Sequence, residues 1–179
     1  CLVPLARRVL ERFVVQYPND PRLPDAVLLL GKARLADGDA AGALDLFRRA
    51  QTLAPVPGRP LEARFWEGEA LFRQKKFADA RTVYDDVVRQ NAASPLAPEA
   101  LYGFAWSELE LKRPEAGAEA FRQLLSAWPD SEIAPSATYY LARTLVELKR
   151  YSEALPLLQA FPTKYAGHKL AADAQYLTG

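Results

Sequence analysis

The sequence predicts an all-α fold, a right-handed α-solenoid built from antiparallel helix pairs, with about ten helices. Three observations predict it. Apolar residues recur along the chain at the spacing of one helix face. Several residue types return after a constant step of 37 residues. Short turns alternate with longer, proline-rich connections, so successive helices run antiparallel and lie side by side.

The 37-residue step appears in one column of large residues and in three columns of small residues. A Gly or Ala at a helix crossing lets two helix axes approach to about 8–10 Å, and a large residue fills the space beside it. We therefore expect each helix pair to pack on the next through the same contacts. The large column is Leu10, Phe47, Tyr84, Phe121 and Leu158, and the small columns are Ala6, Ala43, Ala80, Gly117 and Ala154; Gly31, Gly68, Ala105 and Ala142; and Ala26, Ala63, Ala100, Ala137 and Ala174.

Each cycle contains a helix A followed by a helix B, as residues 62–74 and 78–90 illustrate. The apolar spacing predicts that the chain opens on a helix B, residues 4–17. It closes inside a helix A, residues 170–177. Repeat arrays shield their hydrophobic ends with polar terminal helices, and neither of these helices has a polar outer face. We therefore expect the chain to be a fragment of a longer protein.

All the cycles together form a single repeat domain, residues 1–179. Pro156 and Pro162 fall within the last helix B, so we expect this helix to be short or kinked. The parts are a partial repeat with helix B only, 1–19, four full repeats, 20–56, 57–93, 94–130 and 131–167, and a partial repeat with helix A only, 168–179.

The two kinds of connection have different compositions. The turn from helix A to helix B carries a Gly or a cation where the end of a helix leaves free carbonyl groups and negative dipole charge. The connection from helix B to helix A carries prolines, which are tolerated in the first turn of a helix. In the A-to-B turns, the Gly or cation is Gly38, Lys75, Lys112 or Lys149.

Composition argues against several classes of function. The 179 residues include 23 Lys and Arg against 22 Asp and Glu, a net charge of +1, so no overall field favours nucleic acid. The longest apolar run, residues 26–30, is far too short to span a membrane. His168 is the only histidine, so neither a metal site nor a catalytic triad is expected. We also find no glycine-rich phosphate loop, and expect no enzymatic activity and no cofactor.

The small, small, aromatic and proline positions of these columns resemble the signature of the tetratricopeptide repeat family. Gly31, Ala43, Phe47 and Pro55 meet it in one repeat. Another repeat meets it with Ala105, Gly117, Phe121 and Pro129, whereas the remaining two carry Ala92 and Ala166 in place of the proline. The resemblance covers nearly the entire chain and implies a non-catalytic scaffold for protein–protein interaction.

The repeat length refines the resemblance. The usual period of the family is about 34 residues, and here the B-to-A connections are longer. The "YPND" and "WPDS" turns resemble a subset of bacterial envelope proteins: the periplasmic coordinator of the Tol-Pal system and the lipoprotein of the outer-membrane barrel assembly machinery. This resemblance implies a periplasmic or outer-membrane-associated protein, with the cytoplasm as the alternative.

The start of the chain is open to two interpretations. The sequence contains no methionine and begins at Cys1, which fits a piece cut from a longer chain. A mature lipoprotein also begins with an acylated cysteine, so a lipid anchor at Cys1 is the second interpretation, in which the protein meets the membrane only indirectly. Oligomerisation through the open ends of the array is a further expectation.

Helix A lines the concave side in the resembled family, so its positions outside the small columns are the candidates for binding. We expect a groove for a partner peptide or helix, because aromatic side chains are common binding hot spots. The alternative is that these aromatic residues only pack between neighbouring helices. The expected partner-binding residues are Leu28, Phe65, Glu69, Phe72, Tyr102, Trp106, Tyr139 and Arg143.

Two other functions remain open at this stage. In the first alternative, the chain is a structural spacer or oligomerisation segment of a longer protein. In the second, it recruits substrates for an enzyme domain on the same polypeptide. Both are compatible with a repeat scaffold, because such surfaces are redecorated freely.

Overall fold

The computed structural model describes residues 2–53 and 59–178, with side chains described from residue 6 and, after the gap, from residue 60. Cys1 and Pro55, which the sequence analysis singled out, lie outside these residues. The described residues form ten helices and no strand, which confirms the predicted all-α helical repeat fold.

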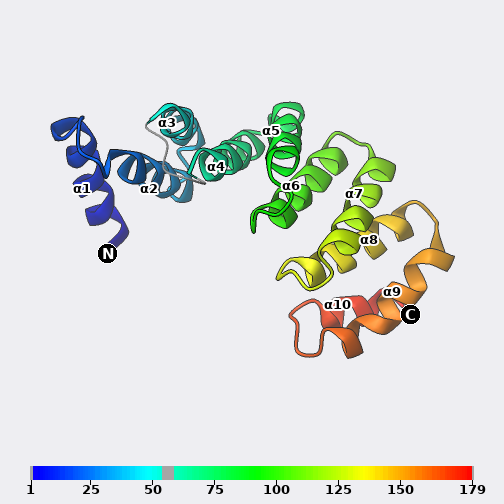
Figure 1. The fold of residues 1–179 in the computed structure, drawn as a ribbon. Coiled ribbons are helices and arrows are strands. Elements are labelled where there is room, and N and C mark those ends of the chain that lie inside the picture. The colour runs from blue at the N-terminus through cyan, green and yellow to red at the C-terminus, as the bar shows by residue number, and fades with distance from the viewer. Residues whose placement is uncertain (1, 54–58, 179) are drawn as a thin grey trace. The chain divides into compact units, whose positions relative to one another are not determined.

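The helices follow one another with short connections (Figure 1). They fall into two compact units, Cys1–Ala92 with α1 to α5 and Ala93–Gly179 with α6 to α10. Whether residues 1–179 behave as a single domain stays a prediction. The helices are α1 Leu2–Gln16, α2 Leu23–Ala36, α3 Ala40–Thr52, α4 Arg59–Arg73, α5 Phe77–Gln90, α6 Ala97–Glu110, α7 Pro114–Ala127, α8 Ala134–Glu147, α9 Tyr151–Lys164 and α10 Ala171–Tyr176.

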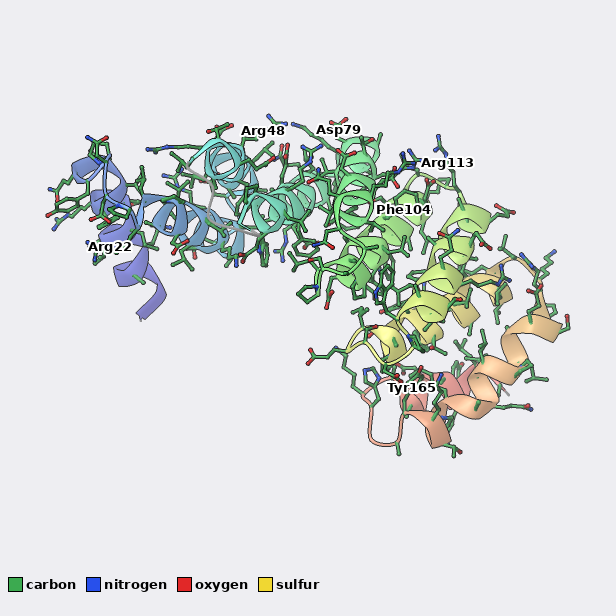
Figure 2. The ribbon with its side chains drawn as sticks, viewed as in Figure 1. Arg22, Arg48, Asp79, Phe104, Arg113 and Tyr165 are labelled. Atoms are coloured by element: carbon green, nitrogen blue, oxygen red, sulfur yellow. The ribbon has the colours of Figure 1, made fainter. Side chains whose placement is uncertain are left out.

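Within each unit, every helix packs on the next one in the chain, as expected for antiparallel pairs joined by short turns. In the first unit α2 also contacts α4, so two helices of type A lie next to each other there. Figure 2 shows the side chains of both units, with Arg113 marking the turn between α6 and α7 and Tyr165 the end of α9.

The repeat columns form the core of both units. From Phe47 to Leu158, every member of the large column is buried, and so is every member of the column from Ala26 to Ala174. The small residues are needed where they stand, because a Cβ added at Gly31 would lie 2.5 Å from Cε1 of Phe47. A Cβ at Gly68 would lie 2.7 Å from the ring of Tyr84 in the same way.

The structure corrects the expectation for the last helix B. α9 runs from Tyr151 to Lys164, 14 residues, the same length as α7, so the predicted shortening is wrong. Pro156 is exposed, and the carbonyl group it leaves unpaired can bond to water. The apolar face of α9 stays continuous through both prolines, because Leu158 and Phe161 are buried in one cluster with Ala142.

The A-to-B turns share one backbone conformation. Lys75, Lys112 and Lys149 have φ of 60°, 62° and 60°, and Gly38 has φ of 89°. After α4, the N–H of Lys75 donates to Phe72 O at 2.8 Å and that of Lys76 to Leu71 O at 3.0 Å. This pair of bonds is the Schellman motif, in which a left-handed residue ends the helix. Three of the four turns therefore place a lysine in a region that favours glycine.

Replacing Lys75 by glycine will stabilise the protein by about 1 kcal/mol, because it removes the cost of a left-handed L-residue. Urea unfolding followed by circular dichroism measures this. Gly38→Ala should destabilise by a similar amount, since no atom lies within 4 Å of the added Cβ and only the backbone conformation opposes it. Lys76→Gly is the control, because Lys76 has φ of −85°. Equal effects of glycine at 75 and 76 would contradict the argument.

Candidate functional site

A groove between α6 and α8 is the candidate binding site of the second unit. Its volume is about 460 Å³, which is enough for a few side chains of a partner. Trp106 lines it from α6, and Tyr140 and Arg143 line it from α8. The other lining residues are Leu109, Glu110, Lys112, Pro114, Thr144 and Glu147.

Three aromatic rings form one wall of the groove and its support. The rings of Trp106 and Tyr140 meet edge to face with centroids 4.7 Å apart. Tyr102 lies 6.3 Å from each of them and 5.6 Å from Phe121 of the core column. Burial raises the pKa of Tyr102 to about 12, so its phenol stays neutral at physiological pH. The aromatic wall is thus held in place by core packing before any partner binds.

The charged lining residues of the groove are mixed in sign. Arg143 donates from Nε to Glu147 at 3.2 Å, one turn along α8. Glu110 ends α6 one turn after Trp106, and Lys112 is the left-handed residue of the next turn. Both are exposed. The groove therefore combines an apolar wall with a charged rim, an arrangement typical of protein-binding surfaces.

The first unit has different residues in the same repeat positions. One step of 74 residues, two repeats, relates Lys32 to Trp106 and Trp66 to Tyr140. Lys32 places Nζ 4.8 Å from the centroid of Trp66 and donates to Glu62 at 2.6 Å. In the first unit, therefore, Lys32 lies over Trp66. At the equivalent position in the second unit, Trp106 lies beside Tyr140.

The structure separates the predicted binding residues into three groups. Leu28 is 1% exposed and Phe65 8%, so both belong to the core, and a partner could reach neither without repacking. Phe65 packs on Tyr84 of α5, with ring centroids 6.1 Å apart. The binding role of the whole predicted set stays a prediction.

Glu69 and Phe72 are half-buried and make contacts within the first unit. Glu69 accepts a hydrogen bond from the Tyr84 hydroxyl at 2.5 Å, and Phe72 packs on Phe77 with centroids 5.2 Å apart. Burial beside the Glu69 carboxylate raises the pKa of Tyr84 far above its ordinary value. Glu69 thus has an internal partner in this structure.

Tyr102, Trp106, Tyr139 and Arg143 all lie in the second unit, and Trp106 and Arg143 line the groove directly. Tyr102 supports Trp106, and Tyr139 packs beside Tyr140 with centroids 5.1 Å apart. Four of the eight predicted residues are therefore at or next to one groove.

Tyr140 is not among the residues that the sequence predicts for binding. It occupies the column Leu29, Trp66, Gly103 and Tyr140, whose residues share no common size, so the column looked uninformative. The usable signal was Trp66 at the same position two repeats earlier. A second aromatic residue on helix A, next to Tyr139, could have indicated an aromatic wall.

In residues 2–53 and 59–178, no group of three or more His, Cys, Asp or Glu side chains is placed to hold a metal ion. Over the same described part of the chain, none of the helices has both the length and the apolar character needed to cross a membrane.

Known structures share the fold at low sequence identity. MamA is 17% identical over 94% of this chain and 87% of its own, with a TM-score of 0.69. BtubC (BKLC) from P. vanneervenii is 14% identical over 98% of this chain and 80% of its own, with a TM-score of 0.77. RapI in its apo form is 11% identical over 97% of this chain and 54% of its own, with a TM-score of 0.80. These likenesses show the fold alone.

A comparison with curated proteins returned no match. The sequence profile of the tetratricopeptide repeat family matches four overlapping stretches, residues 3–60, 58–98, 67–132 and 102–169. These stretches cover the chain almost from end to end, in agreement with the 37-residue columns and the ten helices. The chain belongs to the tetratricopeptide repeat family.

Proposed function

We propose that the protein is an interaction module whose α6/α8 groove binds an exposed segment of a partner protein. The observation that carries the proposal is the groove itself, about 460 Å³ in volume and walled by Trp106 and Tyr140. A helical repeat scaffold suits this function, because its surface side chains can vary without loss of the core.

The size of the groove sets the size of the ligand. It matches two or three side chains, so the ligand is a short extended peptide or one face of a helix and not a whole domain surface. Trp106 is the expected anchor, because a tryptophan contributes a large contact area at low entropic cost and is enriched among hot spots.

Replacing Trp106 by alanine will weaken ligand binding about 10-fold or more. The ligand is obtained by selecting peptides from a random displayed library on the purified protein. Affinities of the selected peptide for the wild type and the variant are then measured by fluorescence anisotropy. The variant should keep its helicity and melting temperature nearly unchanged, because Trp106 is half-buried at the surface of α6.

Trp128→Ala is the matched control. Trp128 follows α7 in the same unit and is also half-buried, but it is not part of the groove lining. The control should bind the selected peptide as the wild type does. If both variants bind equally well, or if no peptide is selected, the groove is not the binding site.

We further propose a periplasmic or outer-membrane-associated location. The support is the length of the B-to-A connections and their "YPND" and "WPDS" turns. Fractionation of cells that produce the protein from its own gene tests this, and recovery with the cytoplasmic fraction would overturn it.

A further inference from the structure

The first unit shows how this repeat position accommodates a cation. Lys32 extends from α2 over the face of Trp66, with its ammonium 4.8 Å from the ring centroid. The same ammonium donates to the Glu62 carboxylate at 2.6 Å. An aromatic face and a carboxylate together form a complete environment for a basic side chain.

The second unit has an aromatic wall at this position and no lysine of its own there. Trp106 replaces Lys32 and Tyr140 replaces Trp66, so two ring surfaces line the groove in place of one ring and one cation. The rings meet at an interplanar angle of 70°, which forms a corner open to the groove. Such corners attract cations because the faces of aromatic rings carry negative potential.

The carboxylate of this groove stands at a different repeat position, because the step of 74 residues relates Glu62 to Ser136. Glu110 lies one helical turn after Trp106 on α6 and lines the same groove. It is exposed, and within the described residues it makes no ion pair with another side chain. The second carboxylate, Glu147, is already bonded to Arg143. Glu110 is therefore the available counter-charge for a ligand.

We propose that the α6/α8 groove selects partner segments by one basic side chain, lysine or arginine, seated against Trp106 and Tyr140 with Glu110 as its counter-ion. This inference rests on the proposed function and adds the chemistry of the ligand. Arg143 and Lys112 line the same groove and oppose a cation. Arg143 is paired with Glu147, and the long exposed side chain of Lys112 can keep its ammonium in water.

Three synthetic peptides test the ligand class. They share the frame obtained from the library selection and differ only at the anchor residue, which is Arg, Gln or Glu. The Arg peptide should bind about 10-fold more tightly than the Gln peptide, the order expected for a cation with an aromatic face and a counter-ion. The Glu peptide should bind most weakly. A Gln or Glu peptide that binds as tightly as the Arg peptide overturns the inference.

Two charge-neutralising variants test the placement of the basic group. Glu110→Gln should reduce the preference for Arg over Gln about 3-fold or more. Lys112→Gln should change the preference in the opposite direction. Glu115→Gln is the control, because Glu115 is exposed in the first turn of α7 and is not part of the groove lining. An unchanged preference in Glu110→Gln overturns the placement.

The outcomes also separate this inference from the proposed function. If no peptide binds, or if binding is independent of Trp106, the proposed function fails and the inference fails with it. If peptides bind through Trp106 but show no preference for a basic anchor, the proposed function stands and only the ligand chemistry is wrong.

Discussion

Replacing Phe47 by alanine is expected to destabilise the protein by about 3–5 kcal/mol, the largest effect of any single substitution considered. Phe47, on α3, is fully buried against α2 and α4. Its ring lies over Gly31 and is stacked 6.3 Å from Trp66. Its removal leaves a cavity that neighbouring helices can fill only by shifting. Chemical denaturation followed by circular dichroism measures the loss, and Tyr151→Ala, which removes an exposed ring, should have little effect.

The contact between Phe47 and Gly31 makes a sharper test, because the effect of one substitution should change sign. Gly31→Ala in the wild type forces a Cβ against the Phe47 ring and should cost about 1–3 kcal/mol. In the Phe47→Ala background that ring is gone. The same Gly31→Ala change should then stabilise by about 0.5–1 kcal/mol, the helix-propensity gain of alanine over glycine. Additive effects of the two substitutions would show that the crossing is not packed as described.

The core was predictable from the sequence because it depends on a repeated steric requirement. Gly31 and Phe47, or Gly68 and Tyr84, meet in the same way in successive repeats, so each pair leaves its trace at the same spacing. The left-handed turn was only partly predictable. The recurrence of lysine suggested a helix end, but the charge pattern gave no indication of positive φ, which Lys75 tolerates at a conformational cost.

The groove was less predictable, because it depends on which residues neighbouring repeats place in one position. Leu28 and Tyr102 belong to one column, yet Leu28 is buried, whereas Tyr102 lies partly exposed behind Trp106. Lys32 and Trp106 also share a column, but Lys32 faces the ring of Trp66, whereas Trp106 faces the ring of Tyr140. The repeat position fixes where a residue lies on its own helix. Whether a groove forms there depends on the side chains that the neighbouring helix places opposite it.

Glu67 is a second structurally important residue that the repeat columns did not predict. It occupies a column with Leu30, Phe104 and Leu141, so a charged residue stands there among apolar ones. Its side chain is 5% exposed. Three donors satisfy it: Arg48 Nε at 3.0 Å, Gln51 Nε2 at 2.9 Å and Arg64 Nη1 at 2.8 Å. The sequence signal for this network was a charged residue in a column whose other members are apolar.

Replacing Glu67 by glutamine is expected to destabilise the protein by about 2 kcal/mol at neutral pH, because it leaves two guanidinium groups without their shared carboxylate. The value is below that of a fully buried ion pair, since Arg48 keeps 56% of its side chain exposed. Urea unfolding at pH 7 measures it. Glu119→Gln, which removes an exposed partner of Arg122, should change the stability by less than about 0.5 kcal/mol.

The pH dependence identifies the origin of this stabilisation. Burial by itself would raise the pKa of Glu67, but the hydrogen bonds from Gln51, Arg48 and Arg64 outweigh it and hold the pKa below its ordinary value. A carboxyl group with a depressed folded-state pKa binds fewer protons in the folded state than in the unfolded state. Its contribution is complete above the unfolded pKa and is lost as the pH falls through the folded pKa. The stability difference between the wild type and Glu67→Gln should therefore shrink from neutral pH towards acid, and a difference independent of pH would assign the effect to packing instead of charge.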